Sequence, residues 1–259
     1  MKNFLFLLLT LSFVLTGRSL AEIREQSVEY TVGGVVCEGW RVFDDSKAGK
    51  QPAVLIVHQW TGLTDYEKMR ARMLAELGYT VFAADIYGKG IRPQPPAAGQ
   101  EAGKYKNDRK HYCERLNAGL AVLQKDEHTD PQRLAAIGYC FGGTGVLELA
   151  RSGAKLKGVV SFHGGLDSPT PEDGKKIKAR VLALHGADDP FVPAKDIAAF
   201  ENEMKSASVD YKLVKYPGAV HAFTLKMAGN DKTKGAAYDA DADAKSWEAM
   251  KNYLTEIFK

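Results

Sequence analysis

Cysteine is scarce in this sequence, with three residues in 259, at positions 37, 113 and 140. Three cysteines are too few for a disulfide scaffold, and their spacing does not fit zinc. No group of His, Asp and Glu has the spacing of metal ligands, so we expect neither a metal nor another cofactor. Cys37 and Cys113 either pair in an oxidising compartment or stay separate thiols. The leftover cysteine is a candidate reactive thiol.

An excess of either charge is also missing. The formal net charge is +3 at pH 7, 26% of the residues are charged, and the basic residues are scattered along the chain. Binding to nucleic acid or to a membrane surface needs basic residues gathered in a patch or stripe. We therefore expect no nucleic-acid partner.

Long hydrophobic runs are absent except at the start of the chain. A lysine, an apolar stretch over 4–15 and the ending "SLA" have the order of a secretory signal peptide. The apolar stretch is short for a membrane span, and an uncleaved anchor is the alternative. We expect residues 1–21 to be a signal peptide and residues 22–259 to be one secreted or periplasmic domain, with no membrane contact after cleavage.

Beyond the first 21 residues, β and α patterns alternate. Residues 28–43 predict a hairpin, and short apolar runs such as "AVLIVH" are typical of strands buried on both faces. Alternating strands and helices favour an α/β fold with a doubly wound, mostly parallel sheet flanked by helices. The expected strands cover 53–58, 80–88, 133–139, 157–165, 179–186 and 210–218, and the expected helices cover 65–78, the stretch from 142 onward, 194–207 and 236–257.

Residues 88–104, rich in Gly, Pro and Ala, form an unusually long connection, and residues 228–243 form a second one. Connections in compact domains are usually short, and longer ones tend to be lids or binding loops. The 88–104 stretch is therefore either a lid or a surface excursion.

Cys140 lies in the sequence "GYCFGG", between a predicted strand and a predicted helix. This is the nucleophile-elbow pattern with cysteine in the place of serine. Residues around the nucleophile must be small because side chains there would clash with nearby backbone. The start of the helix favours a thiolate. The alternative is a buried cysteine in a glycine-rich turn.

Two later strand ends supply partners, in the chain order nucleophile, acid and base that elbow folds use. Asp189 in "LHGADDPFVP" can orient an imidazole, with Asp188 as the less favoured neighbour, and His221 in "YPGAVHAF" can act as a base. Ligands bind beyond the carboxyl ends of parallel strands, where these residues are expected. The order predicts Cys140, Asp189 and His221 as the catalytic residues.

Stabilising an oxyanion takes two N–H donors. We expect one from Phe141, which follows the candidate nucleophile, and one from Trp60, in the loop after the first buried strand. His58 is expected to pack behind this loop. His163 and His185 precede glycines at strand ends, which suggests positioning or loop-packing roles.

The motifs "GYCFGG", "HGADDPFVP", "AVHAF" and "HQWTGL" resemble those of the dienelactone hydrolase family of α/β-hydrolases, and the resemblance covers roughly residues 25–258. It implies a single domain with the α/β-hydrolase fold. It also implies a carboxylic-ester hydrolase of the carboxymethylenebutenolidase class, which cleaves a small ester or lactone through an acyl-cysteine intermediate. The resemblance carries the catalytic and oxyanion roles over to the same residues.

The sequence departs from that family at its substrate-binding positions. Family members often have a glutamate where Gln59 stands, and a glutamine cannot accept the thiol proton. Lys89 and Leu225 stand near the places of two arginines that hold the substrate carboxylate in the dienelactone-cleaving enzymes. We expect Gln59, Tyr87 and Lys89 to contact the substrate, and His221 to activate the thiol.

Two other interpretations stay open. One is a non-catalytic periplasmic binding or redox-responsive protein on the same fold, and the other is a thioesterase or another carboxylic-ester hydrolase. In each case we expect a monomer whose partner is a small molecule.

Overall fold

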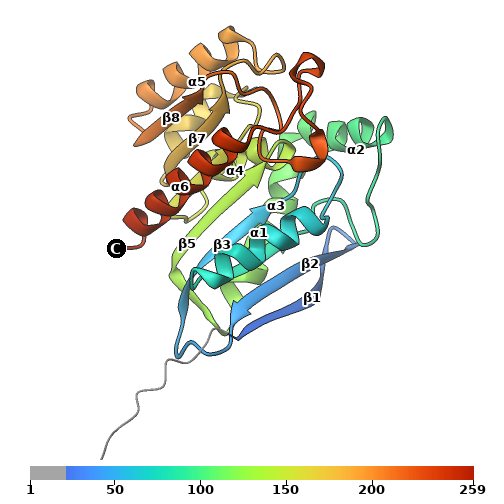
Figure 1. Cartoon of the computed structure of the whole chain (residues 1–259). Helices are drawn as coiled ribbons and strands as arrows, with labels where there is room; N and C mark the ends of the chain where they lie inside the picture. The colour runs from blue at the N-terminus through green and yellow to red at the C-terminus, as the bar shows by residue number, and fades with distance from the viewer. Residues whose placement is uncertain (1–21) are drawn as a thin grey trace, which may run out of the picture.

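The computed structural model of the protein describes residues 22–259 and centres on an eight-stranded sheet with helices on both faces (Figure 1). The signal peptide predicted for residues 1–21 lies outside the described residues. The spatial order of the strands is β1 (Ile23–Val32), β2 (Val35–Asp44), β4 (Thr80–Ala84), β3 (Gln51–Val57), β5 (Thr129–Tyr139), β6 (Gly158–Phe162), β7 (Arg180–Gly186) and β8 (Tyr211–Tyr216).

The sheet is antiparallel only at its first edge. β1 and β2 form the predicted hairpin, and β2 pairs antiparallel with β4. From β4 to β8 every neighbouring pair is parallel. The predicted doubly wound, mostly parallel sheet is confirmed, and its parallel strands place their carboxyl ends along one edge.

The helices divide between the two faces of the sheet. Side chains of α1 (Asp65–Glu76) and α6 (Ala240–Ile257) share one buried cluster with one face. Those of α3 (Arg109–Lys125), α4 (Phe141–Arg151) and α5 (Ala194–Ser206) share a second cluster with the other face. α2 (Ala97–Lys106) packs beside α3 on that second face. Short 3-10 turns complete the chain at Pro171–Lys176, Lys226–Ala228 and Lys232–Lys234.

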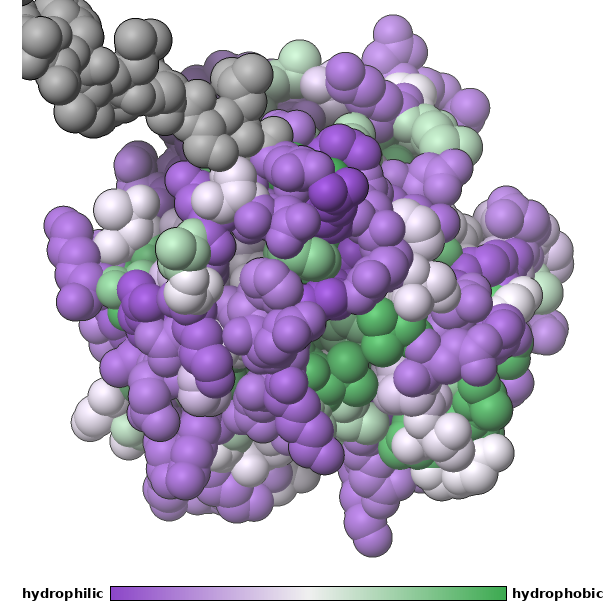
Figure 2. All heavy atoms as spheres, turned by 90° about the horizontal axis from the view of Figure 1, so that it is seen from below, coloured by the Kyte–Doolittle hydropathy of each residue, from purple (hydrophilic) through white to green (hydrophobic). Residues whose placement is uncertain are grey.

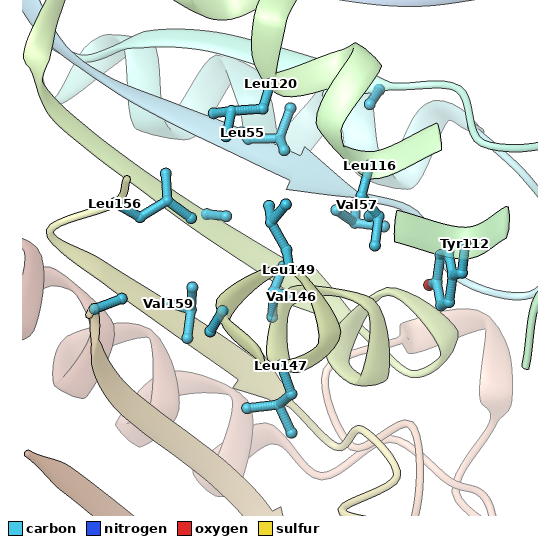
Figure 3. Close-up of a cluster of buried hydrophobic side chains, with 14 of the residues drawn as sticks. Leu55, Val57, Tyr112, Leu116, Leu120, Val146, Leu147, Leu149, Leu156 and Val159 are labelled. Atoms are coloured by element: carbon cyan, nitrogen blue, oxygen red, sulfur yellow. The ribbon is translucent and has the colours of Figure 1, made fainter. Parts of the chain in front are cut away.

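The second cluster surrounds the helix that follows Cys140. Leu149 and Val146 of α4 lie between α3 and strands β3 and β6 in Figure 3. All residues of α4 are buried, and this explains its apolar sequence "FGGTGVLEL". A helix buried all round is fixed by packing on every side, so its first turn has a rigid position above the sheet.

The two long connections are partly helical: the sequence analysis expected the helix that ends the second connection but missed the one in the first. α2 begins at Ala97, inside the 88–104 stretch, and α3 was not among the expected helices. The 228–243 stretch holds a 3-10 turn and the start of α6. The Gly, Pro and Ala content hid α2, although Ala98, Ala102 and Tyr105 are buried at helical spacing.

The three cysteines are free thiols, so Cys37 and Cys113 do not pair. Cys37 is buried and accepts a hydrogen bond from Arg115, and Cys113 donates to the carbonyl of Glu148. Within residues 22–259, no helix has both the length and the hydropathy that crossing a bilayer requires. The face in Figure 2 is mainly hydrophilic around a small hydrophobic cluster.

Candidate active site

Cys140 occupies a strained turn between β5 and α4. Its backbone angles are φ 54° and ψ −113°, in a region that costs a non-glycine residue about 1–3 kcal/mol. Neighbouring backbone leaves no room for side chains. A Cβ on Gly138 would lie 2.0 Å from the carbonyl oxygen of Gly142, and one on Gly142 would lie 2.1 Å from that of Val57. These glycines therefore let the chain turn sharply enough to place the thiol at the carboxyl edge of the sheet.

The structure brings Cys140, His221 and Asp189 together in one array. His221 Nε2 lies 3.0 Å from Cys140 Sγ, and His221 Nδ1 lies 2.8 Å from Asp189 Oδ2. The other carboxylate oxygen of Asp189 accepts the N–H of Phe191 at 2.9 Å. Asp188 is exposed, as the lower preference for it implied. A thiol, an imidazole and a carboxylate in this order can form and stabilise a thiolate.

The electrostatics of the array favour an ion pair. Burial raises the pKa of the Cys140 thiol, but the charge and hydrogen bond of His221 and the N–H of Phe141 outweigh it and leave the pKa below its usual range. Lys106 acts in the same direction. Burial lowers the pKa of His221, and the Cys140 sulfur and Asp189 raise it above the usual range. These shifts favour the ion pair of thiolate and imidazolium over the neutral pair.

His221 is held by the connection that precedes α6. Its N–H donates to the carbonyl of Gly235 at 3.1 Å, and its carbonyl accepts the N–H of Ala237 at 3.0 Å. The 228–243 stretch thus serves to position the imidazole.

The loop after β3 is held from below by buried polar groups. His58 Nδ1 donates to the Gln59 carbonyl at 2.6 Å, and its Nε2 accepts the N–H of Ile86. Burial lowers the pKa of His58 to about 4, so it stays neutral and keeps that acceptor. Its ring stacks on Phe141, which places it behind the loop as predicted. Among the described residues, the Trp60 N–H donates to no group.

A pocket of about 960 Å³ opens above the array. Gln59, Trp60 and Phe141 form part of its wall, as predicted, together with Leu225. The side-chain amide of Gln59 makes no hydrogen bond with another described residue. The rest of the wall comes from α2 and its surroundings, the start of α4 and the loops after β6, β7 and β8: Pro95, Gly99, Ala102, Gly103, Lys106, Asn107, Thr144, Gly165, Phe191, Val192, Ala222, Met227, Ala228, Lys234 and Ala236.

Two predicted substrate residues do not reach this pocket, and their assignment is corrected. Tyr87 is buried, and its hydroxyl donates to the Trp60 carbonyl at 3.0 Å, so it supports the loop from behind. Lys89 is half-exposed and pairs with Glu29 and Glu38 on β1 and β2. Both residues lie just after β4, and neither lines the pocket.

Lys106 is one of two lysines in the wall, with Lys234, that the sequence interpretation missed. It stands at the last position of α2, and among the described residues it has no acidic partner. No Asp or Glu of the described residues lines the pocket, and the charged side chains of its wall outside the array are Lys106 and Lys234. Within the same residues, no three His, Cys, Asp or Glu side chains form a group that could hold a metal ion.

The parallel sheet and the elbow at its carboxyl edge define the class: this protein is a hydrolase with the α/β-hydrolase fold. Residues 40–258 match the family model of the dienelactone hydrolase family. The chain belongs to that family and is a dienelactone hydrolase-like hydrolase.

Individual relatives agree with this assignment. The chain is 27% identical to the Synechocystis protein named "Putative carboxymethylenebutenolidase", over 81% of this chain and 88% of the relative. It is 38% identical to m3DLH, with a TM-score of 0.88 over 92% of this chain and 99% of the other. It is also 38% identical to the dienelactone hydrolase-like promiscuous phosphotriesterase P91 from metagenomic libraries, with a TM-score of 0.87 and the same coverage.

The packing around the elbow predicts different effects for two glycine substitutions. Gly142→Ala puts a methyl group 2.1 Å from a backbone oxygen. We therefore expect the free energy of unfolding to fall by about 3 kcal/mol or more. Gly103→Ala, on helix α2, meets nothing nearer than 3.8 Å and should stabilise by about 0.5–1 kcal/mol. Urea unfolding midpoints measure both, and equal midpoints would contradict the close approach.

An ordinary cysteine thiol has a pKa of about 8.5. The ion pair predicts that Cys140 reacts with iodoacetamide well below this pH. Because its pKa is lowered, the thiolate fraction of Cys140 at neutral pH exceeds that of an ordinary thiol and falls on acidification. In His221→Ala, burial still raises the pKa of the thiol but the imidazolium no longer lowers it. The pH midpoint of the alkylation rate should therefore rise. Peptide mapping by mass spectrometry provides an internal control in Cys113, where burial and Glu148 raise the pKa to about 12. A wild-type midpoint at the ordinary value would contradict the pair.

Proposed function

We propose that this hydrolase cleaves a small ester or lactone through a covalent acyl-cysteine, with Cys140 as nucleophile, His221 as acid and base, and Asp189 as the residue that orients His221. The observation that carries the proposal is the 3.0 Å contact between Sγ and Nε2, continued by the 2.8 Å contact to Asp189. The pocket of about 960 Å³ gives a small substrate room at this contact.

In the first half of the reaction, the Cys140 thiolate attacks the carbonyl carbon and forms a tetrahedral oxyanion. The N–H groups of Phe141 and Trp60 are the candidate donors to this oxyanion, because one begins α4 and the other has no acceptor among the described residues. The intermediate collapses with cleavage of the C–O bond, and the leaving alkoxide takes the proton from the His221 imidazolium. An acyl-cysteine remains.

In the second half, neutral His221 takes a proton from water, and the resulting hydroxide attacks the acyl carbon. The C–S bond breaks, the acid leaves, and the proton on His221 restores the ion pair with the thiolate. Asp189 stabilises the imidazolium in both halves because its carboxylate accepts the Nδ1–H. With a lactone, the released alcohol and acid belong to one hydroxy acid.

The wall of the pocket limits the substrate class. Trp60, Phe191 and Met227 offer apolar surface, and Lys106 and Lys234 carry the positive charges. This lining favours neutral or anionic substrates with an apolar portion over cationic ones. The proposed setting is outside the cell or in the periplasm, which rests on the sequence pattern of residues 1–21.

The decisive experiment tests the mature chain on an ester, lactone, thioester and phosphotriester panel. Cys140→Ala and Cys140→Ser should lower kcat/KM by at least about a thousandfold, because the nucleophile is lost. Cys113→Ala is the matched control, since Cys113 lies away from the pocket, and should keep wild-type rates. Mass spectrometry of quenched turnover should show the acyl group on Cys140. Retained turnover in Cys140→Ala, or binding without turnover across the panel, would overturn the proposal.

Gln59→Glu tests whether the loop after β3 faces the thiol. A buried carboxylate beside the sulfur disfavours the thiolate, so we expect slower iodoacetamide labelling of Cys140 at pH 7 and a lower kcat. Gln100→Glu adds the same charge on the exposed side of α2 and should leave both unchanged. Identical kinetics and labelling for Gln59→Glu and wild type would count against a Gln59 side chain that faces the thiol.

A further inference from the structure

A buried histidine outside the array contacts the turn that carries Cys140. His163 follows β6, and its backbone N–H continues the sheet by donating to the Leu184 carbonyl at 2.8 Å. Its φ of 40° is unusual for a residue with a side chain. The N–H of Cys140 is shared between the Phe162 carbonyl at 3.0 Å and His163 Nδ1 at 3.1 Å. The His163 ring thus lies under the nucleophile turn.

The hydrogen bonds of His163 fix its tautomer. Nδ1 accepts from Cys140, so the proton stands on Nε2, which then donates to Thr224 Oγ1 at 2.8 Å. Thr224 belongs to the loop that carries His221, three positions further on. The edges of the His163 and His221 rings also meet, with centroids 5.3 Å apart. One ring therefore joins the segments that carry the sulfur and the imidazole.

Further polar contacts connect Thr224 to α1 and α6, the two helices on the other face of the sheet from α4. Tyr66 of α1 donates to Thr224 Oγ1 at 2.7 Å, and Arg70 donates to the Tyr66 hydroxyl at 3.2 Å and to the Thr224 carbonyl at 3.3 Å. Arg70 also pairs with Asp243 of α6 at 2.6 Å. Thr224 is thereby held from α1 and α6.

The charges around His163 keep it neutral. Burial lowers its pKa well below the usual value, and the charged groups that face it act in the same direction: His221 from the loop after β8, Arg70 from α1 and His185 from β7. A protonated ring would direct an N–H at the N–H of Cys140. Neutrality therefore preserves the acceptor that the turn requires.

We propose that His163 and Thr224 are positioning residues, which hold the Cys140 turn and the His221 loop at the spacing that the sulfur–imidazole hydrogen bond needs. The inference rests on the proposed function, since the array must act as nucleophile and base. Neither residue lines the pocket, so both act through Cys140 and His221 and not on the substrate.

Thr224→Val tests the inference, because valine keeps the shape of threonine but removes the acceptor of the His163 proton. We expect kcat to fall by about tenfold to a hundredfold with KM within about twofold. The midpoint of Cys140 alkylation should move to higher pH as the imidazole drifts from the sulfur. Thr224→Ser restores the hydroxyl and should recover most of the lost rate. Thr255→Val, on the exposed side of α6, is the matched control and should behave as wild type.

His163→Asn keeps the test decisive if Thr224→Val fails to fold. Asparagine tolerates positive φ and its oxygen can still accept from Cys140, but it loses the link to Thr224. We expect the same fall in kcat and the same alkylation shift. Wild-type kcat and alkylation in both folded variants would overturn the inference, as would equal impairment of Thr224→Ser and Thr224→Val. Alkylation needs no turnover, so it tests the inference even if no panel substrate is cleaved, whereas that outcome alone would reject the proposed function.

Discussion

The close approach of α4 to the sheet is the constraint on which the rest of the site depends. The first turn of this helix lies so near the backbone of β3 and β5 that Gly138 and Gly142 cannot carry a side chain. This approach forces Cys140 into a strained turn and brings the start of α4 to the sulfur. Packing around the fully buried helix stabilises the strain, since a helix fixed on all sides cannot relax away from it.

The same geometry determines how burial and neighbouring charges together set the pKa of the Cys140 thiol. Burial and the charge of Glu148 raise the pKa of the Cys113 thiol to about 12. Cys140 differs because its partner is an imidazole that a buried carboxylate already orients. Both shifts favour charge separation between the sulfur and the imidazole before any substrate binds. Neutral His58 and His163 frame this pair without adding a competing positive charge.

Strand ends and local motifs could be predicted because they depend on nearby sequence. The pattern around Cys140 and the order of Asp189 and His221 singled out three side chains that lie within hydrogen-bond distance of one another. Tyr87 and Lys89 were misplaced for a physical reason. A residue after a strand can turn to either side, and Lys89 turns toward acids of β1 and β2, while Tyr87 turns inward beneath Trp60. Such choices depend on distant partners, which periodicity does not reveal.

The reactive side chains of the pocket and most of its lining residues come from different parts of the chain. The array stands on strand ends of the central sheet, whereas much of the wall belongs to α2 and to the connection before α6. The exposed wall residues of these segments, such as Gly99 and Lys234, lie outside the packed cluster around α4. Exchanges at such positions would change the shape and charge of the pocket while the sulfur, imidazole and carboxylate keep their places.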